Sequence, residues 1–325
     1  MSRDLLKNLP VIFRSPRHNS QFLITRQHVR YCNQGRTTKK NAPPVPPLKS
    51  CFQDEKYKPD ELIGQPDIYC RLTAERHSTA LLKRLGFTIP TEIEHVRKEK
   101  GSRTISKQEY KLLKNTKCPP LPRKKKSRTK AIAVDCEMAY GRDGTEQPVS
   151  ICIVDVIQGK VLLNSFVKPQ QRIFKWNSHI HGIDLSTFTA ESNHLNGWDE
   201  ARSRLFELID KDTVIVGHAL RNDLKGLRVA HDNIVDTAVL TSKAVFGTES
   251  LKRYWSLKTL CAEFLDMRIQ TGSKHSALED TMATREVALW CIYNPDKMHE
   301  WASKQKEFLM QEKDEILGQV VRGGL

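Results

Sequence analysis

Several features that would place the chain in a special class are missing. No apolar run reaches the 18 residues that suggest a membrane-spanning helix, and the stretch 9–13 is too short for the apolar core of a secretory signal. The eight cysteines are scattered, aromatic residues make up only 7%, and no internal repeat is visible. We therefore expect a reduced intracellular protein without a membrane partner.

Acidic residues are scarce in the first part of the chain. Residues 1–130 hold 11 acidic and 30 basic residues, whereas 131–325 hold 27 acidic and 23 basic ones. All of the net charge of +15 therefore lies in the first part. Such segregation favours a basic module that meets a polyanion. The alternative is a solvated extension that only keeps the protein in solution.

The first 69 residues are expected to be largely disordered. In 1–50 one acid, Asp4, stands against ten Lys and Arg, and a Pro-rich spacer covers 43–47. An Arg-rich, acid-poor start is also typical of a mitochondrial presequence. Both interpretations stay open.

Residues 70–118 predict an accessory region of short helices. Thr91 and Ser106 are each followed three residues later by Glu, as in a capping box, and Gly86 is a stop signal. A Pro/Lys/Arg linker follows at 119–130. Its basic run indicates a nuclear localisation signal or a nucleic-acid contact, with a charged linker as the alternative.

From residue 131 the pattern becomes α/β. Apolar or alternating strands are expected at 131–135, 149–156, 161–167, 213–217 and 234–235. Helices are expected at 199–210, 219–231, 256–265 and 276–292. We predict a mixed five-stranded sheet flanked by helices over 131–293, followed by a charged helical tail at 294–325.

Two acids stand at the end of the first strand. Asp135 and Glu137 are two residues apart, so their carboxylates point to the same side of a strand. Adjacent carboxylates repel each other, and a divalent cation such as Mg²⁺ or Mn²⁺ resolves that conflict. Asp223 and Asp280 also lie near helix starts. Four acids so placed predict a metal site.

These segments resemble the DEDDh 3′→5′ exonucleases, which have an RNase H-like fold. The motifs are Asp135-x-Glu137, the run ending at Asp223, and His275 five residues before Asp280. The Tyr subclass would need Tyr at position 276, where the chain has Ser. The first motif, Val-Asp-Cys-Glu-Met, is most similar to that of eukaryotic RNA exonucleases.

The resemblance implies a reaction with two divalent cations, Mg²⁺ or Mn²⁺. Asp135 would bridge both cations, Glu137 and Asp280 would complete one site, and Asp223 would be an inner or water-mediated ligand of the other. His275 would be the general base. The residues expected to contact substrate are Met138, Ala139, Leu220, Arg221 and Lys274.

The predicted function is hydrolysis of single-stranded RNA from its 3′ end, releasing nucleoside 5′-monophosphates, in the processing of rRNA or another structured RNA. The alternatives are a DNA 3′→5′ exonuclease, and a nucleic-acid-binding ribosome-assembly factor with a nuclease fold that joins pre-ribosomal particles. The basic run favours the nucleus or nucleolus, and the first 35 residues allow the mitochondrion. Oligomeric state is not predicted.

Overall fold

The computed structural model describes residues 65–98, 106–122, 129–190, 193–248, 251–272 and 274–322, all within the compact unit Pro47–Leu325. The predictions made for residues 1–64, including the Pro-rich spacer, and for the basic residues 123–128 lie outside the described residues. Among the described residues, no helix combines the length and the apolar composition needed to cross a bilayer.

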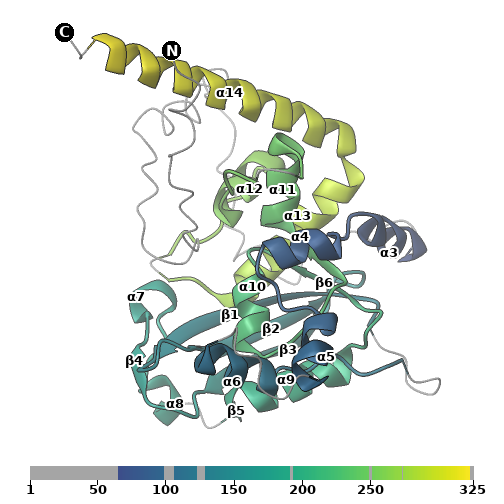
Figure 1. Cartoon of the computed structure of the whole chain (residues 1–325), viewed down its shortest axis with the longest axis vertical. Helices are drawn as coiled ribbons and strands as arrows, with labels where there is room; N and C mark the ends of the chain where they lie inside the picture. Colours follow the sequence, from purple (N-terminus) through teal and green to yellow (C-terminus); the bar gives the residue numbers. More distant parts are fainter. Residues whose placement is uncertain are drawn as a thin grey trace. The chain divides into compact units, whose positions relative to one another are not determined.

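A mixed sheet of seven strands runs through the molecule in the order β5-β3-β2-β1-β6-β7, with β4 paired to β1 (Figure 1). β1, β2 and β3 form an antiparallel meander, and β6 and β7 continue parallel to β1. The strands are β1 Ala131–Gly141, β2 Glu146–Asp155, β3 Val161–Lys168, β4 Ile173–Lys175, β5 His194–Asn196, β6 Val214–Gly217 and β7 Ile234–Asp236.

The five expected strands are present, but the sheet has two more. β4 and β5 have three residues each and lie within the stretch 169–198, which has no alternating pattern in the sequence. They form because they pair with longer strands: Lys175 lies opposite Tyr140 of β1, and His194 opposite Phe166 of β3. The prediction of five strands was therefore too low.

A tight turn that contains Gly159 joins β2 and β3. Gly159 has a φ of 68°, in the left-handed region that glycine adopts without strain. The Asp155 carboxylate accepts hydrogen bonds from the amides of Ile157 and Gln158, at 2.8 and 2.9 Å. This Asx turn fixes the meander that positions β1.

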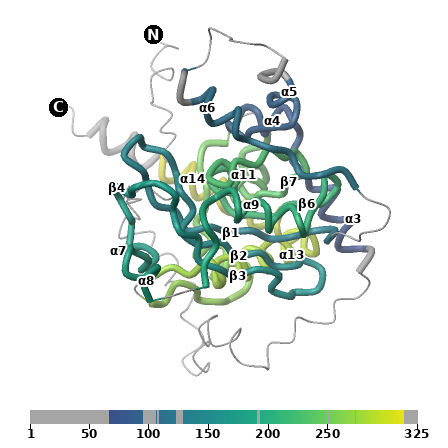
Figure 2. Tube along the Cα trace, turned by 90° about the horizontal axis from the view of Figure 1, so that it is seen from below, coloured from purple at the N-terminus to yellow at the C-terminus, as the bar shows by residue number. Residues whose placement is uncertain are grey.

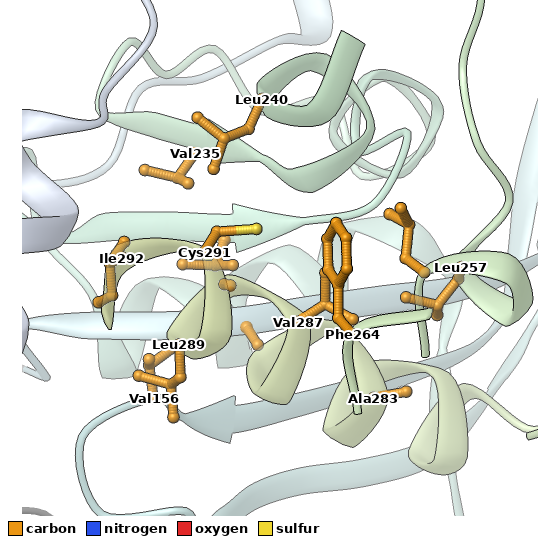
Figure 3. Close-up of a cluster of buried hydrophobic side chains, with 14 of the residues drawn as sticks. Val156, Val235, Leu240, Leu257, Phe264, Ala283, Val287, Leu289, Cys291 and Ile292 are labelled. Atoms are coloured by element: carbon orange, nitrogen blue, oxygen red, sulfur yellow. The ribbon is translucent and has the colours of Figure 1, made fainter. Parts of the chain in front are cut away.

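Helices cover both faces of the sheet (Figure 1). One core joins the sheet to α11, α12, α13 and α3, and Figure 3 shows part of it around Phe264 and Val287. The other core joins the sheet to α9, α10 and the segment after α4. These helices are α3 Gln65–Ala74, α4 Thr79–Arg84, α9 Gly197–Leu208, α10 Arg221–Gly226, α11 Thr237–Phe246, α12 Leu257–Phe264 and α13 Ala277–Tyr293.

The accessory helices share these cores with the sheet. Ile68 and Leu72 belong to the first core, and Leu82, Phe87 and Ile89 to the second. All five side chains are at most 4% exposed. The region is therefore built into the folding unit of the α/β domain.

Two of the three helix boundaries predicted in the accessory region are confirmed. Ser106 caps α6, Lys107–Asn115, through a 3.1 Å bond from the Glu109 amide, and Gly86, at φ 76°, follows the end of α4. The predicted cap at Thr91 is wrong, because α5, Pro90–Lys98, begins one residue earlier. Proline suits the first position of a helix, since its fixed φ is already helical.

The predicted tail helix is α14, Pro295–Arg322. Its first part packs on the α/β domain, because Ala302 is buried and the Trp301 ring lies 5.0 Å from the rings of both Trp255 and Phe264. Figure 2 shows α14 in yellow beside α11. The part of α14 around Ala302 thus belongs to the core.

Candidate active site

The two acids of β1 lie at the point where the strand leaves its parallel neighbour. β1 pairs with β6 only through residues 131–133, and a register shift follows Glu137 in its pairing with β2. Asp135 and Glu137 are 8% and 7% exposed. β1 continues to Gly141, so both carboxylates lie in the middle of this buried strand, and the prediction that they stand at its end is wrong.

Asp280 brings a third carboxylate from α13. It sits in the first turn of that helix and is 7% exposed. One ligand atom from each of Asp135, Glu137 and Asp280 can be chosen so that all three lie within 4.8 Å of one another. Three of the four predicted acids therefore form one buried cluster.

The chemistry of this cluster fits a divalent cation. Three buried carboxylates at such spacing repel one another and lose their hydration. Oxygen donors are the ligands that Mg²⁺ and Mn²⁺ prefer, and a cation offsets the repulsion. The three residues can thus hold a metal ion.

Asp223 approaches the same strand from α10. It is 1% exposed, and its Oδ1 accepts a 3.1 Å hydrogen bond from the amide of Cys136, the residue between the two β1 acids. This hydrogen bond places Asp223 beside the cluster, but Asp223 is not one of its three carboxylates. Its role as a metal ligand stays a prediction.

His275 lies next to the cluster and is exposed to solvent. Its Nδ1 lies 3.4 Å from Oδ2 of Asp280, and its side chain is 42% exposed. Its backbone amide donates to the carbonyl of Ile180 at 2.7 Å, which fixes the loop before α13. The imidazole can therefore reach solvent while one nitrogen remains next to a carboxylate.

The loop that carries Asp223 is shaped by Asp236. This buried carboxylate accepts hydrogen bonds from the amides of Ala219, Leu220 and Ala238, at 2.8 to 3.0 Å. Ala219 has a φ of 57°, which is unusual for a non-glycine residue. Burial raises the pKa of Asp236, and the amide bonds oppose that shift. Asp236 therefore has a structural role.

Residues 132–288 match the model of the exonuclease family RNase_T. Residues 132–288 form a DEDDh-type exonuclease domain. The match covers the sheet and α9 to α13 and ends before α14. All five residues that give the group its name are therefore present: Asp135, Glu137, Asp223, Asp280 and His275.

Three individual proteins illustrate the similarity. RNA exonuclease 3 of Candida albicans is 34% identical over 51% of this chain and 39% of its own length. Small RNA degrading nuclease 2 of Arabidopsis thaliana is 33% identical over 60% of this chain and 42% of its own. The solved Pan2 catalytic unit of Neurospora crassa has a TM-score of 0.47 and 18% identity, over 60% of this chain and 32% of that one. The chain thus spans less than half of these two curated relatives.

Three residues expected to contact substrate are buried in the exonuclease domain. Ala139 and Leu220 are 0% exposed and Met138 is 5% exposed. The Met138 methyl group and the Leu220 side chain lie so close to Gly226 and Gly217 that a Cβ on either glycine would clash with them. In this conformation the three side chains pack in the core, and their expected contact with substrate stays a prediction.

The two predicted cationic contacts lie in different places. Lys274 is exposed next to His275, and its Nζ donates to the carbonyl of Ser178 at 2.6 Å. Arg221 lines a groove of about 1090 Å³ between the accessory helices and the hairpin of β1 and β2. None of the clustered acids lines that groove. Lys274 is therefore beside the general-base candidate, and Arg221 faces another surface.

Two residues that hydrogen-bond to the site were not predicted from the sequence. The Gln270 side-chain amide donates to both oxygens of Asp280, at 3.0 and 3.2 Å, and its backbone φ is 53°. Asn177, with a φ of 59°, donates from Nδ2 to the carbonyl of Met138 at 3.1 Å. Gln270 lies in the segment before the third motif, and this position was the one feature of the sequence that could have indicated its role. Nothing in the spacing indicated Asn177.

Proposed function

We propose that the protein is a metal-dependent 3′→5′ exoribonuclease that releases nucleoside 5′-monophosphates. The observation that carries the proposal is the buried cluster of Asp135, Glu137 and Asp280 with His275 beside it, inside an exonuclease domain. Names of relatives such as RNA exonuclease 3 favour RNA over DNA as the substrate. A DNA exonuclease remains the competing outcome of the test.

The chain's own residues supply binding, orientation and proton transfer. Asp135, Glu137 and Asp280 would hold divalent cations, with Asp223 at the second of two positions. Such cations polarise a phosphate and lower the pKa of the attacking water. His275, with a proton on Nδ1 next to Asp280, receives the proton of the attacking water at Nε2. Gln270 orients Asp280 through both carboxylate oxygens.

The decisive experiment is digestion of a 5′-labelled single-stranded RNA with Mg²⁺ or Mn²⁺, beside a DNA of the same sequence. We expect a ladder that shortens from the 3′ end, lost with EDTA. Asp135→Asn should lower the rate at least a thousandfold, since removing one central catalytic group costs about that much in other hydrolases. Asp212→Asn, at an exposed ion pair with Lys211, is the matched control.

A second readout follows metal binding without catalysis. Mg²⁺ should raise the Tm of the wild type, because a ligand that binds only the folded state stabilises it, and should raise that of Asp135→Asn much less. Folded wild type that binds Mg²⁺ but cleaves neither strand would contradict the proposal. That result would support the assembly-factor alternative.

Location and pathway form a separate part of the proposal. The basic residues 123–130 favour the nucleus or nucleolus and a role in rRNA processing. A reporter fused to residues 1–130 should enter the nucleus, and the same fusion with 123–126 changed to Ala should not. Import of a 1–50 fusion into mitochondria would overturn this location.

A further inference from the structure

An exposed aromatic side chain lies on β4, near the acid cluster. Phe174 is 77% exposed. All other aromatic side chains of Phe, Tyr and Trp in the described ranges are buried or half-buried. Its neighbour Ile173 packs instead against the small core around Ala139. Single exposed apolar side chains are common at protein surfaces, so Phe174 indicates a binding surface only together with its neighbours.

The surroundings of Phe174 carry positive charge in an otherwise acidic domain. Between Asp155 and Asp184 the sequence contains no Asp or Glu but four cations. Two of them are exposed near Phe174: Arg172 directly before β4 and Lys175 at its end. The next acid, Asp184, accepts hydrogen bonds from the amide and hydroxyl of Ser186. The net charge along this strand is therefore opposite to that of residues 131–325 as a whole.

The position of β4 places this surface next to the site. Lys175 pairs with Tyr140, three residues beyond Glu137 on β1. At about 3.3 Å per residue and about 4.8 Å between strands, Phe174 lies roughly 15 Å from the acids. Figures 1 and 2 both show β4 and α7, Ser178–His181, side by side near β1.

The segment is also held rigidly against the catalytic loops. Asn177, directly after β4 and Trp176, binds the Met138 carbonyl, and the Ile180 carbonyl of α7 accepts the amide of His275. Lys274 binds the Ser178 carbonyl from the same loop. Phe174 thus stands on a strand whose continuation is bonded to β1, at the residue after Glu137, and to the loop that carries His275.

We propose that Phe174, with Arg172 and Lys175, is a stacking platform for a base of the single-stranded RNA upstream of its 3′ end. Proteins that bind single strands combine exposed aromatic rings for stacking with cations for phosphates, and β4 offers this combination. This inference rests on the proposed function, because it assumes that the substrate is RNA or another single strand.

Binding of a labelled single-stranded RNA of about ten nucleotides tests the platform apart from catalysis. Fluorescence anisotropy in an Asp135→Asn background keeps the RNA intact. Phe174→Ala should raise Kd about thirtyfold, the middle of the range for loss of one base–aromatic stack. Phe174→Trp should restore binding, and Met310→Ala, at a side chain 52% exposed on α14, should bind as the background does.

Kinetics then separate a platform from damage to the active site. In the otherwise wild-type protein, the ratio of kcat/KM for the RNA to kcat/KM for the p-nitrophenyl ester of a nucleoside 5′-monophosphate should fall about thirtyfold in Phe174→Ala. An equal loss on both substrates, or an unchanged Kd, would overturn the platform. If the wild type does not cleave RNA but Phe174→Ala still weakens RNA binding, the proposed function is overturned and the platform is not.

Discussion

His77 is a buried imidazole committed to the backbone of β7. Its Nε2 accepts the amide of Asp236 at 2.9 Å, and its own amide donates to the carbonyl of Ile234 at 3.0 Å. Burial lowers its pKa from 6.5 to about 4. Because Asp236 in turn shapes the loop that carries Asp223, neutral His77 supports the active site from the accessory region.

The pH dependence of stability should report this histidine. Its folded-state pKa lies below its unfolded value, so its contribution is complete above pH 6.5 and is lost as pH falls to about 4. The shift corresponds to about 3 kcal/mol of unfolding free energy. Urea unfolding between pH 7 and 4 should show a shallower decline in His77→Gln than in the wild type. His299→Gln, at an exposed histidine, is the control, and equal slopes in all three proteins would contradict the prediction.

Single residues also show what the sequence could predict. Asp135, Glu137 and Asp280 could be found because their spacing follows the period of a strand and the start of a helix. The burial of Met138 and Leu220 could not be predicted, because the choice between core and surface depends on their close contacts with Gly226 and Gly217. Gln270 and Asn177 act through side-chain amides, and their left-handed backbone leaves no pattern in non-glycine residues.

Among the elements, the accessory helices behave as part of the exonuclease domain. The Phe87 side chain, 4% exposed, packs in the same core as strands β1 and β6. The sequence predicted short helices here. The surface on which these helices pack could not be predicted, since apolar residues on a short helix do not specify the surface that covers them.

Phe87→Ala should destabilise the whole domain in one transition. Loss of a buried phenyl ring costs about 3–5 kcal/mol. All five tryptophans lie at residue 176 or later, so their fluorescence reports the exonuclease domain and α14 but not the accessory helices. The urea midpoint by fluorescence should fall in Phe87→Ala and stay unchanged in Leu121→Ala, where the side chain is 72% exposed. An unchanged midpoint in Phe87→Ala would show that the accessory region unfolds independently.

The missed elements share one cause. β4 and β5 have only three residues each, and α11 is buried on most of its sides, so no regular alternation of polar and apolar residues appears in their sequences. β4 and β5 depend on pairing with β1 and β3, and α11 depends on the Asp236 cap at its start. The local sequence pattern predicts elements that are long and amphipathic, whereas tertiary contacts determine whether the other elements form.

In the whole molecule, positive charge is in excess in residues 1–64, before the first described helix. Residues 1–64 hold 12 basic and 5 acidic residues. If this segment binds RNA phosphates, its removal should weaken binding and reduce the dependence of Kd on salt. The slope of log K against log salt should become shallower by about 0.7 for each phosphate that the segment neutralises.

The measurement compares the full chain with residues 65–325, both carrying Asp135→Asn, on single-stranded RNA from 50 to 300 mM KCl. The fragment keeps α3 and all later elements, so its fold should be intact by circular dichroism. Equal slopes for the two proteins would show that residues 1–64 make no ionic interaction with RNA.

The shared cores of the accessory helices also constrain the ancestry of this protein. The family match begins at Ile132, but the side chains of Leu72 and Leu82 complete the cores beneath that domain. Gene recombination at residue 131 would leave those apolar surfaces uncovered and the donor segment without a partner. We therefore expect lineages to inherit residues 65–122 together with the exonuclease domain, and exchange of flanking segments to occur before residue 65.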